Sequence, residues 1–308
     1  LAWIYALTGR LAEAERLFQE STSYYADYDS AAYRVIYAEG LVGLAAVQRA
    51  RGELPRAEQL LQQAVTLTTR YGVHDQRELG VALEELARLY VTKRDLRSAE
   101  PLLAQVQQIR SAALGPRHPE RARALSRLGA LHRLAGDAKR AAAELGEALA
   151  MQEETLDPAH PDRAETQHEL GLLALEAGEL GAADTRLHAA LAAREESLGA
   201  QHALVADSLA ALAELHLRRR DLAGAEPLIR RALAVREQAL GADHPEVASA
   251  LGDLAALLLR GGRVAEARAA VARALDIQDR RAPMILAMGT EEQKLSYLRS
   301  TRREADLA

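Results

Sequence analysis

The sequence predicts an all-α solenoid built from helical hairpins that repeat every 42 residues. A six-residue segment at 114–119, Leu-Gly-Pro-Arg-His-Pro, recurs in related form at 156–161, 198–203 and 240–245. Aromatic residues make up only 4% of the 308 residues, a composition that suits close-packed helices better than strands. A fixed period of this size is typical of solenoids, in which each repeat buries its apolar face against its neighbours.

Each period contains two helical patterns separated by a short turn. In the period that begins at Pro119, apolar residues at three- and four-residue steps predict a helix from about Pro119 to Arg133. Gly136-Asp137 interrupts the pattern, and a second helix is predicted to continue to about Thr155. Each period therefore predicts one helical hairpin.

Three columns of residues keep the same register along the chain. A small residue early in the second helix allows the two helices to approach closely, and a Gly in the turn favours the left-handed conformation that ends a helix. The second-helix column is Ala57, Ala99, Ala141, Ala183, Ala225 and Ala267, with Ala14 one residue out of step. The turn column is Gly52, Arg94, Gly136, Gly178, Arg220 and Gly262, and the first-helix column is Leu44, Leu86, Leu128, Leu170, Leu212 and Leu254.

The repeat unit is similar to the tetratricopeptide repeat (TPR). The likeness rests on a Leu followed by a small residue, an aromatic residue or His one turn later, and Ala and Leu on the second helix. The basic TPR has about 34 residues, and the extra length here coincides with the Leu-Gly-x-x-His-Pro segment, as in the longer repeats of kinesin light chains. The resemblance covers about residues 1–281. It implies a right-handed TPR superhelix (an α-solenoid) of about seven helical hairpins.

The two ends depart from the repeat. The first residues align with the middle of a first helix, so we expect an incomplete first hairpin and a chain that is a fragment of a longer protein. The register stops at Ala282-Pro283, and residues 282–308 are expected to form a linker and a capping helix from about Glu291 to Glu304. Residues 289–298 resemble the segment that joins TPR arrays to CHAT domains, which are caspase-like cysteine peptidase domains of bacteria. This resemblance implies that a CHAT domain begins there and that its His and Cys follow Ala308.

Composition bounds the remaining function classes. The chain has no Cys, and its 39 basic and 44 acidic residues are interleaved with a net charge of −5, which offers no basic field for direct binding of nucleic acid. No apolar run approaches the length that spans a membrane, and no signal peptide is evident. We therefore expect a cytoplasmic protein. Its oligomeric state is not indicated by the sequence.

No combination of residues in the sequence indicates catalysis, a cofactor or a metal. The recurring His118, His160, His202 and His244 are predicted to close the turn before the next helix, since packed helices about 8 to 10 Å apart hold such rings too far apart to share a metal ion. His132 and His216 fall on apolar helix faces, where packing is the simpler interpretation. Adjacent pairs such as Glu84-Glu85 point about 100° apart and are interpreted as solvated helix faces. We expect that this chain is not an enzyme.

The first helices of a solenoid line its concave face, where we expect a groove for a protein or peptide partner. Helical geometry places an Arg-rich patch flanked by acidic residues there, although a merely solvated face is the alternative. The candidate groove residues are Glu84, Arg88, Arg123, Arg127, Arg133, His168, Glu169, Glu214 and Asp253. A possible aromatic patch is Tyr24, Tyr25 and Tyr28, for which packing within the hairpins is the alternative.

The resemblances also indicate which ligands not to transfer. Kinesin light chains commonly have paired Asn on this helix face, where the present chain has Ser126-Arg127 and His168-Glu169. The Lys and Asn set with which some TPR proteins clamp a C-terminal carboxylate is also absent. The leading hypothesis is the regulatory array of a TPR-CHAT peptidase. The alternative is a TPR adaptor, or the sensor arm of another signalling protein such as a STAND-type ATPase.

Overall fold

The computed structural model describes residues 1–7, 10–72, 76–115 and 117–288, and within them it contains fourteen α-helices and no strand. The helices are α1 (Ala2–Leu7), α2 (Leu11–Tyr25), α3 (Ala31–Ala50), α4 (Leu54–Tyr71), α5 (Arg77–Thr92), α6 (Leu96–Ala113), α7 (Pro119–Leu134), α8 (Ala138–Thr155), α9 (Pro161–Glu176), α10 (Leu180–Leu198), α11 (Ala203–Arg218), α12 (Leu222–Leu240), α13 (Pro245–Arg260) and α14 (Val264–Met288). The predicted all-α repeat of helical hairpins is confirmed.

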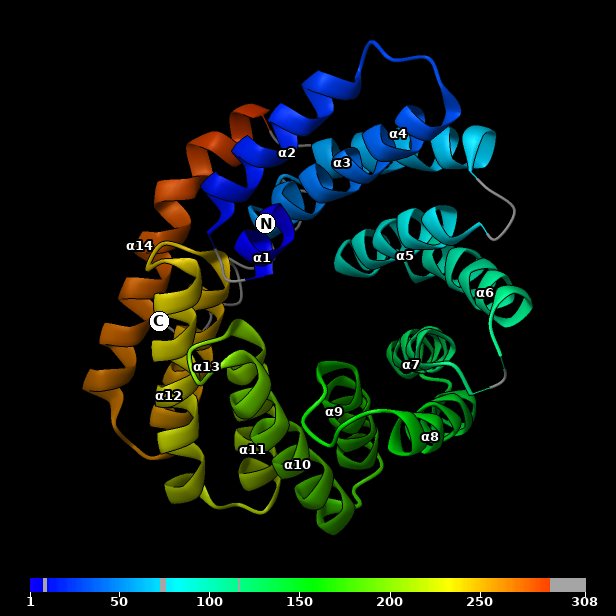
Figure 1. Cartoon of the computed structure of the whole chain (residues 1–308). Helices are drawn as coiled ribbons and strands as arrows, with labels where there is room; N and C mark the ends of the chain where they lie inside the picture. The colour runs from blue at the N-terminus through cyan, green and yellow to red at the C-terminus, as the bar shows by residue number, and fades with distance from the viewer. Residues whose placement is uncertain (8–9, 73–75, 116, 289–308) are drawn as a thin grey trace. The chain divides into compact units, whose positions relative to one another are not determined.

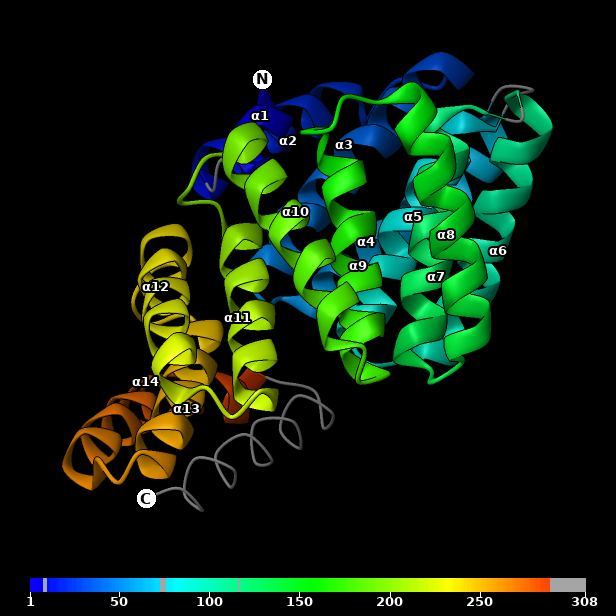
Figure 2. The same cartoon turned by 90° about the horizontal axis from the view of Figure 1, so that it is seen from below.

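The helices group into two compact units, divided between Asp157 and Pro158. In unit 1 each helix from α1 to α8 packs against the next one, and the first helices α3 and α5 also contact each other. In unit 2 the same succession runs from α9 to α14 (Figures 1 and 2). Each unit has its own buried apolar clusters, such as the one shared by α3, α4 and α5 and the one shared by α9, α10 and α11.

The predicted column of small residues lies at the closest contacts within the hairpins. All seven Ala side chains, from Ala14 to Ala267, are buried, at 1% exposure or less. The facing position of the first helix is equally tight, because a Cβ on Gly129 would lie 2.6 Å from Cγ of Leu145. The close approach inferred from these columns is confirmed.

The predicted turn column ends each first helix in the left-handed conformation. Gly136 has a φ of 82°, and the next residue, Asp137, donates its backbone N–H to the carbonyl of His132 at 2.8 Å. This bond satisfies one of the carbonyls that a helix C-terminus leaves without a partner. Arg94 and Arg220 adopt the same conformation with φ of 62° and 61°, although they carry a Cβ.

The recurring His residues are N-caps of the first helices. The Nδ1 atoms of His118, His160, His202 and His244 each accept a hydrogen bond from the backbone N–H two residues later, at 3.1 to 3.2 Å. Each His thereby satisfies an N–H that the first helical turn leaves without a carbonyl partner. The prediction that these side chains close the turn before the next helix is confirmed.

The C-terminal boundary predicted at residue 281 falls inside a continuous helix. Helix α14 runs on through Ala282-Pro283 and ends at Met288. The capping helix predicted over 291–304 lies outside the described residues. Among the helices that the structure describes, none is both long and apolar enough to cross a membrane.

Candidate partner-binding site

Five arginine side chains gather on neighbouring helices of unit 1, and we call them the arginine cluster. They are Arg49 of α3, Arg88 of α5, Arg110 of α6, and Arg123 and Arg127 of α7. The carboxylates of Glu84, Glu85 and Glu120 lie among them. The columns predicted to share one face on α5 and α7 therefore do meet in space.

Glu84 is the buried centre of the cluster. Its carboxylate pairs with the guanidinium of Arg110, and its Oε1 atom lies 3.6 Å from Nε of both Arg123 and Arg127. The Glu84 side chain is only 8% exposed, so it lies beneath the arginines instead of facing solvent. It therefore orients the guanidinium groups and is not itself presented to a ligand.

The surrounding charges control the ionisation of Glu84. Burial alone would raise its pKa, because a charged carboxylate is poorly solvated inside a protein. The positive charges of Arg110, Arg127 and Arg123 outweigh burial, with a smaller contribution from Arg88, and lower the pKa of Glu84 to about 2. Glu84 is therefore ionised at neutral pH.

Glu85 organises the second half of the cluster. Its Oε1 atom lies 3.1 Å from Arg88 of the same helix, and its Oε2 atom lies 3.7 Å from Arg49 of α3. Burial lowers the pKa of Arg49, and the positive charges of Arg88 and Arg127 add to this effect while Glu85 opposes it. The arginines are thus close enough to repel one another.

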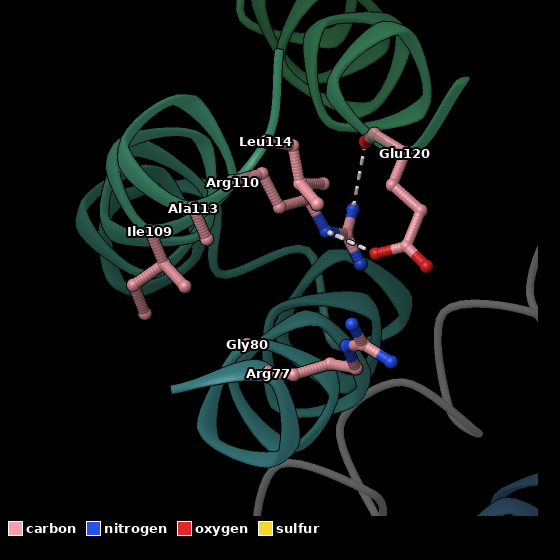
Figure 3. A pocket seen from close by; sticks show the side chains of 7 residues that line it. All are labelled: Arg77, Gly80, Ile109, Arg110, Ala113, Leu114 and Glu120. Atoms are coloured by element: carbon pink, nitrogen blue, oxygen red, sulfur yellow. Dashed lines mark hydrogen bonds and ion pairs between the residues drawn. The ribbon is translucent and has the colours of Figure 1, made fainter. Parts of the chain in front are cut away.

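A small pocket lies beside the cluster, where Arg110 reaches from α6 towards α7 (Figure 3). The Arg110 guanidinium donates to the backbone carbonyl of Glu120 at 3.4 Å, and its Nε atom lies 3.7 Å from the Glu120 carboxylate. The pocket is lined by Arg77, Gly80, Ile109, Arg110, Ala113, Leu114 and Glu120. The pocket is too small for a drug-sized ligand, so we interpret it as a gap between packed helices.

Arg110 belongs to a column of buried polar residues that the sequence interpretation missed. At the equivalent place in unit 2, Arg194 is 2% exposed and bonds Ser208 Oγ and the Leu204 carbonyl of the next first helix. The column continues one period later with Arg236, which pairs with Asp207 at 3.0 Å. Arg or Gln at 42-residue spacing inside an otherwise apolar helix face was the available signal.

Val81 is a second residue that the sequence interpretation missed. It lies on α5 one period before Arg123, in the same column, and its side chain is 39% exposed. On α5 it lies one helical turn before Glu84 and Glu85, the two carboxylates that pair with the cluster arginines. The sequence signal that could have identified Val81 is its position 42 residues before Arg123, in a predicted groove column.

The remaining predicted groove residues differ in accessibility. Arg133 is half-buried on α7 in unit 1. In unit 2, His168 is buried and Glu169 half-buried on α9, Asp253 is half-buried on α13, and Glu214 is exposed on α11, 2.9 Å from Arg218. The groove remains a prediction, and Glu84, Arg88, Arg123 and Arg127 of unit 1 are the predicted groove residues that the structure brings together in one cluster of ion pairs.

The predicted aromatic patch forms a group of mutually packed rings between α2 and α3. The ring centres of Tyr24 and Tyr25 lie 5.0 Å apart, and Tyr28 packs against Tyr24 at 5.6 Å. Tyr33 of α3 completes the group, 4.8 Å from Tyr28. Tyr24 and Tyr28 stay exposed, so the rings pack on one another and also face solvent.

The other candidate residues are two His side chains that contact carboxylates. His132 is buried, with Nδ1 2.6 Å from the carboxylate of Glu144, and Nδ1 of His216 lies 2.8 Å from the carboxylate of Asp221. Within the described part of the chain, no group of His, Asp or Glu has the arrangement to hold a metal ion.

Comparison with known proteins places this geometry in a family. The sequence matches none of the curated proteins with which it was compared. It is similar to the crystal structure of BtubC (BKLC) from P. vanneervenii at 24% identity, over 75% of this chain and 92% of that chain, with a TM-score of 0.59. A putative kinesin light chain from Podospora anserina with nearly identical TPR-like repeats is 26% identical over 66% of this chain and 95% of that chain, with a TM-score of 0.53.

A third structure shares the fold over almost the whole length. It is a Rap protein complexed with Competence and Sporulation Factor, 12% identical over 99% of this chain and 86% of that chain, with a TM-score of 0.70. The family model of the tetratricopeptide repeat matches residues 37–112, 78–154, 162–238 and 208–280. These matches cover most of the chain, which therefore belongs to the tetratricopeptide repeat family and has repeats like those of kinesin light chains.

Proposed function

We propose that the arginine cluster is the surface with which this TPR array recognises a protein partner. The observation that carries the proposal is the convergence of guanidinium groups from α3, α5, α6 and α7 on a surface with an exposed apolar neighbour, Val81. Arg and apolar anchors are frequent at the centres of binding surfaces. The Rap protein with a similar fold is complexed with Competence and Sporulation Factor, so the fold is compatible with a bound partner.

We further propose that the array regulates a CHAT peptidase domain in the same protein. The support is the likeness of residues 289–298 to the segment that joins TPR arrays to such domains. Partner binding at the arginine cluster would then control the downstream peptidase. The gene is expected to encode a His and Cys dyad after Ala308, and a reading frame that stops near Ala308 would contradict this part of the proposal.

Partner binding is tested by removing the charge from three half-buried arginines of the cluster. In the full-length protein, Arg88→Gln/Arg123→Gln/Arg127→Gln is expected to lower partner recovery in affinity capture at least about tenfold, because each lost charged contact costs about 1.5–3 kcal/mol. Gln is preferred to Glu, because a new carboxylate beside Glu84 would add repulsion to the core of the cluster.

The matched control removes the same charge elsewhere. Arg218, Arg230 and Arg231 are each paired with Glu in unit 2 and are 44 to 46% exposed. Their triple Gln variant should keep full partner recovery, and circular dichroism should show both variants folded. Equal recovery by the two triple variants would refute the role of the cluster.

A further inference from the structure

Four tyrosine rings gather at the turn between α2 and α3 (Figure 1), and we call them the tyrosine group. Tyr24 and Tyr25 end α2, Tyr28 lies in the turn, and Tyr33 lies in the first turn of α3. Tyr24, Tyr28 and Tyr33 are 64%, 40% and 40% exposed. The group therefore presents several aromatic rings to solvent at one place in unit 1.

The turn that joins α2 to α3 is held in place by Arg34. The Arg34 guanidinium donates to the backbone carbonyl of Ala26 at 3.1 Å and to Oδ1 of Asp29 at 2.7 Å. Ser30 caps the start of α3, because its hydroxyl accepts the backbone N–H of Tyr33 at 3.4 Å. The backbone beneath the rings is thus fixed before a ligand arrives, which reduces the entropy that binding would cost.

Other tyrosines of this chain lie beneath a cation. The guanidinium of Arg10 lies 4.1 Å from the ring centre of Tyr5, and that of Arg70 lies 5.1 Å from the ring centre of Tyr71. In such contacts the positive charge is attracted to the negative face of the ring. Among the residues that the structure describes, no cation lies over a ring of the tyrosine group. The group therefore holds rings of the kind that cations occupy elsewhere in the chain.

The charges around the tyrosine group favour a positive ligand. Asp27 and Asp29 both lie on the turn, and α2 ends just before them with no basic residue in its last turn to offset the negative end of the helix dipole. A hydrogen bond from Arg34 and the positive charges of Arg34 and Arg70 lower the pKa of Asp29. Asp27 is exposed and pairs with no cation in the described part of the chain. A positive group bound here would give Asp27 a partner.

We infer that the tyrosine group binds an arginine side chain of a partner protein. The ring centres of neighbouring members lie 4.8 to 6.3 Å apart, so the rings contact one another and leave no space between them for a rounded ammonium group. A planar guanidinium instead stacks on an outward ring face while its N–H groups donate to Asp27. This surface lies outside the arginine cluster, so the inference goes beyond the proposed function and does not depend on it.

The test measures binding of the side chain itself to the chain of 308 residues. The peptide N-acetyl-Gly-Arg-Gly amide is titrated at pH 7.5 while NMR records the signals of isotopically labelled tyrosine rings, with single Tyr→Phe variants for assignment. The signals of Tyr24, Tyr28 and Tyr33 are expected to shift saturably, whereas that of Tyr5, whose ring already has a cation over it, should not. Peptides with uncharged citrulline or with lysine in place of arginine are expected to bind at least about threefold more weakly.

Two pairs of variants separate the rings and the carboxylate from general effects. Tyr24→Leu/Tyr28→Leu removes two rings and should weaken binding at least about threefold, whereas Tyr24→Phe/Tyr28→Phe keeps the rings and should preserve it. Asp27→Asn should weaken binding at least about twofold. Asp279→Asn removes the same charge from an exposed position on α14 and should leave binding unchanged.

Several results would overturn the inference. They are equal affinity for the arginine peptide and either analogue, unchanged binding by the Leu variant, loss of binding in the Phe variant, and equal effects of the two Asn variants. Circular dichroism should show each variant folded. If the Leu variant does not fold, the peptide comparison and the two Asn variants still decide between binding and its absence.

Discussion

Glu84 shows at the scale of one residue why a surface cannot be predicted from helical geometry alone. Its angular position on α5 places it with Arg88 on the predicted groove side, yet its carboxylate is buried. The cause is Arg110, which comes from the next helix, 26 residues later in sequence. Burial depends on which side chains from other helices cover a position. The periodicity of one helix therefore predicts the direction in which a side chain points, but not how deeply it is buried.

The ionisation of Glu84 makes the stability of the protein depend on pH. Its pKa is about 2 in the folded chain and 4.5 as the ordinary value, so the folded state favours the ionised form. The stabilisation is complete above about pH 5 and is lost as the pH falls towards 2, at about 1.4 kcal/mol per pKa unit. Urea denaturation should show wild type more stable than Glu84→Gln by about 3 kcal/mol at pH 6, with the difference shrinking steadily below pH 4.5.

Glu214→Gln is the control for this measurement. Glu214 is 47% exposed and pairs with Arg218 one turn later on its own helix. Exposed pairs of this kind contribute about 0.3–0.5 kcal/mol, so the control should change the free energy of unfolding little at any of these pH values. A Glu84→Gln variant with the same small, pH-independent effect would contradict the central role of Glu84 in the cluster.

Arg94 and Arg220 stand out among the turns that join the helices of each hairpin. They occupy the turn column in which the other hairpins have Gly, and both adopt a left-handed φ. A side chain with a Cβ pays a steric penalty in this region of about 1–2 kcal/mol, which Gly avoids. We expect Arg94→Gly to stabilise the protein by about 1 kcal/mol and to raise its melting temperature in a thermal denaturation experiment.

A Gly substitution is expected to destabilise the protein at the residue just before the turn column, and Ala135 tests this in another hairpin. Ala135 precedes Gly136, has a right-handed φ of −79° and is exposed. Replacing it with Gly adds freedom to the unfolded chain without relieving strain, so Ala135→Gly should destabilise by about 0.5–1 kcal/mol. If Arg94→Gly lowers the melting temperature as Ala135→Gly does, the strain assigned to this turn is absent.

The elements themselves were largely predictable because local physical rules determine them. The helix predicted from Pro119 to Arg133 is α7, Pro119–Leu134, and the second helix ends at Thr155 as predicted. The role of the recurring His residues was also predictable, because each stands in the turn just before the next helix begins. The column of the buried Arg110 and Arg194 and the half-buried Arg236 was missed, because charged residues within a helix suggest a solvated face until the covering helices are placed.

At the scale of the molecule, the period was predictable but the division into units was not. The loop motif at 156–161 matches its relatives at 114–119 and 198–203, so the sequence continues through this point without a break. The structure nevertheless divides between Asp157 and Pro158. Residue columns specify how one hairpin is built, whereas compactness depends on packing summed over many hairpins.

The partner is the feature that neither period nor composition specifies. A solenoid tolerates many different surface residues once its apolar columns are filled, and we propose that some of these surface positions carry the recognition chemistry. In unit 1 these surface positions include the arginine cluster and Val81. Val264, by contrast, is the first residue of α14, the second helix of its hairpin, and lies outside the predicted groove columns. Val81 and Val264 are both exposed apolar residues, at 39% and 55%, and therefore form a matched pair of probes.

The most direct test of the proposed binding surface is photo-crosslinking from these two positions. The photoreactive amino acid p-benzoylphenylalanine is placed at position 81 or 264 of the full-length protein, and crosslinked partner is identified by mass spectrometry after irradiation. Our account predicts a partner adduct from position 81, lost in Arg88→Gln/Arg123→Gln/Arg127→Gln, and none from position 264. An adduct from position 264 alone, or one from position 81 that survives in the triple variant, would contradict it.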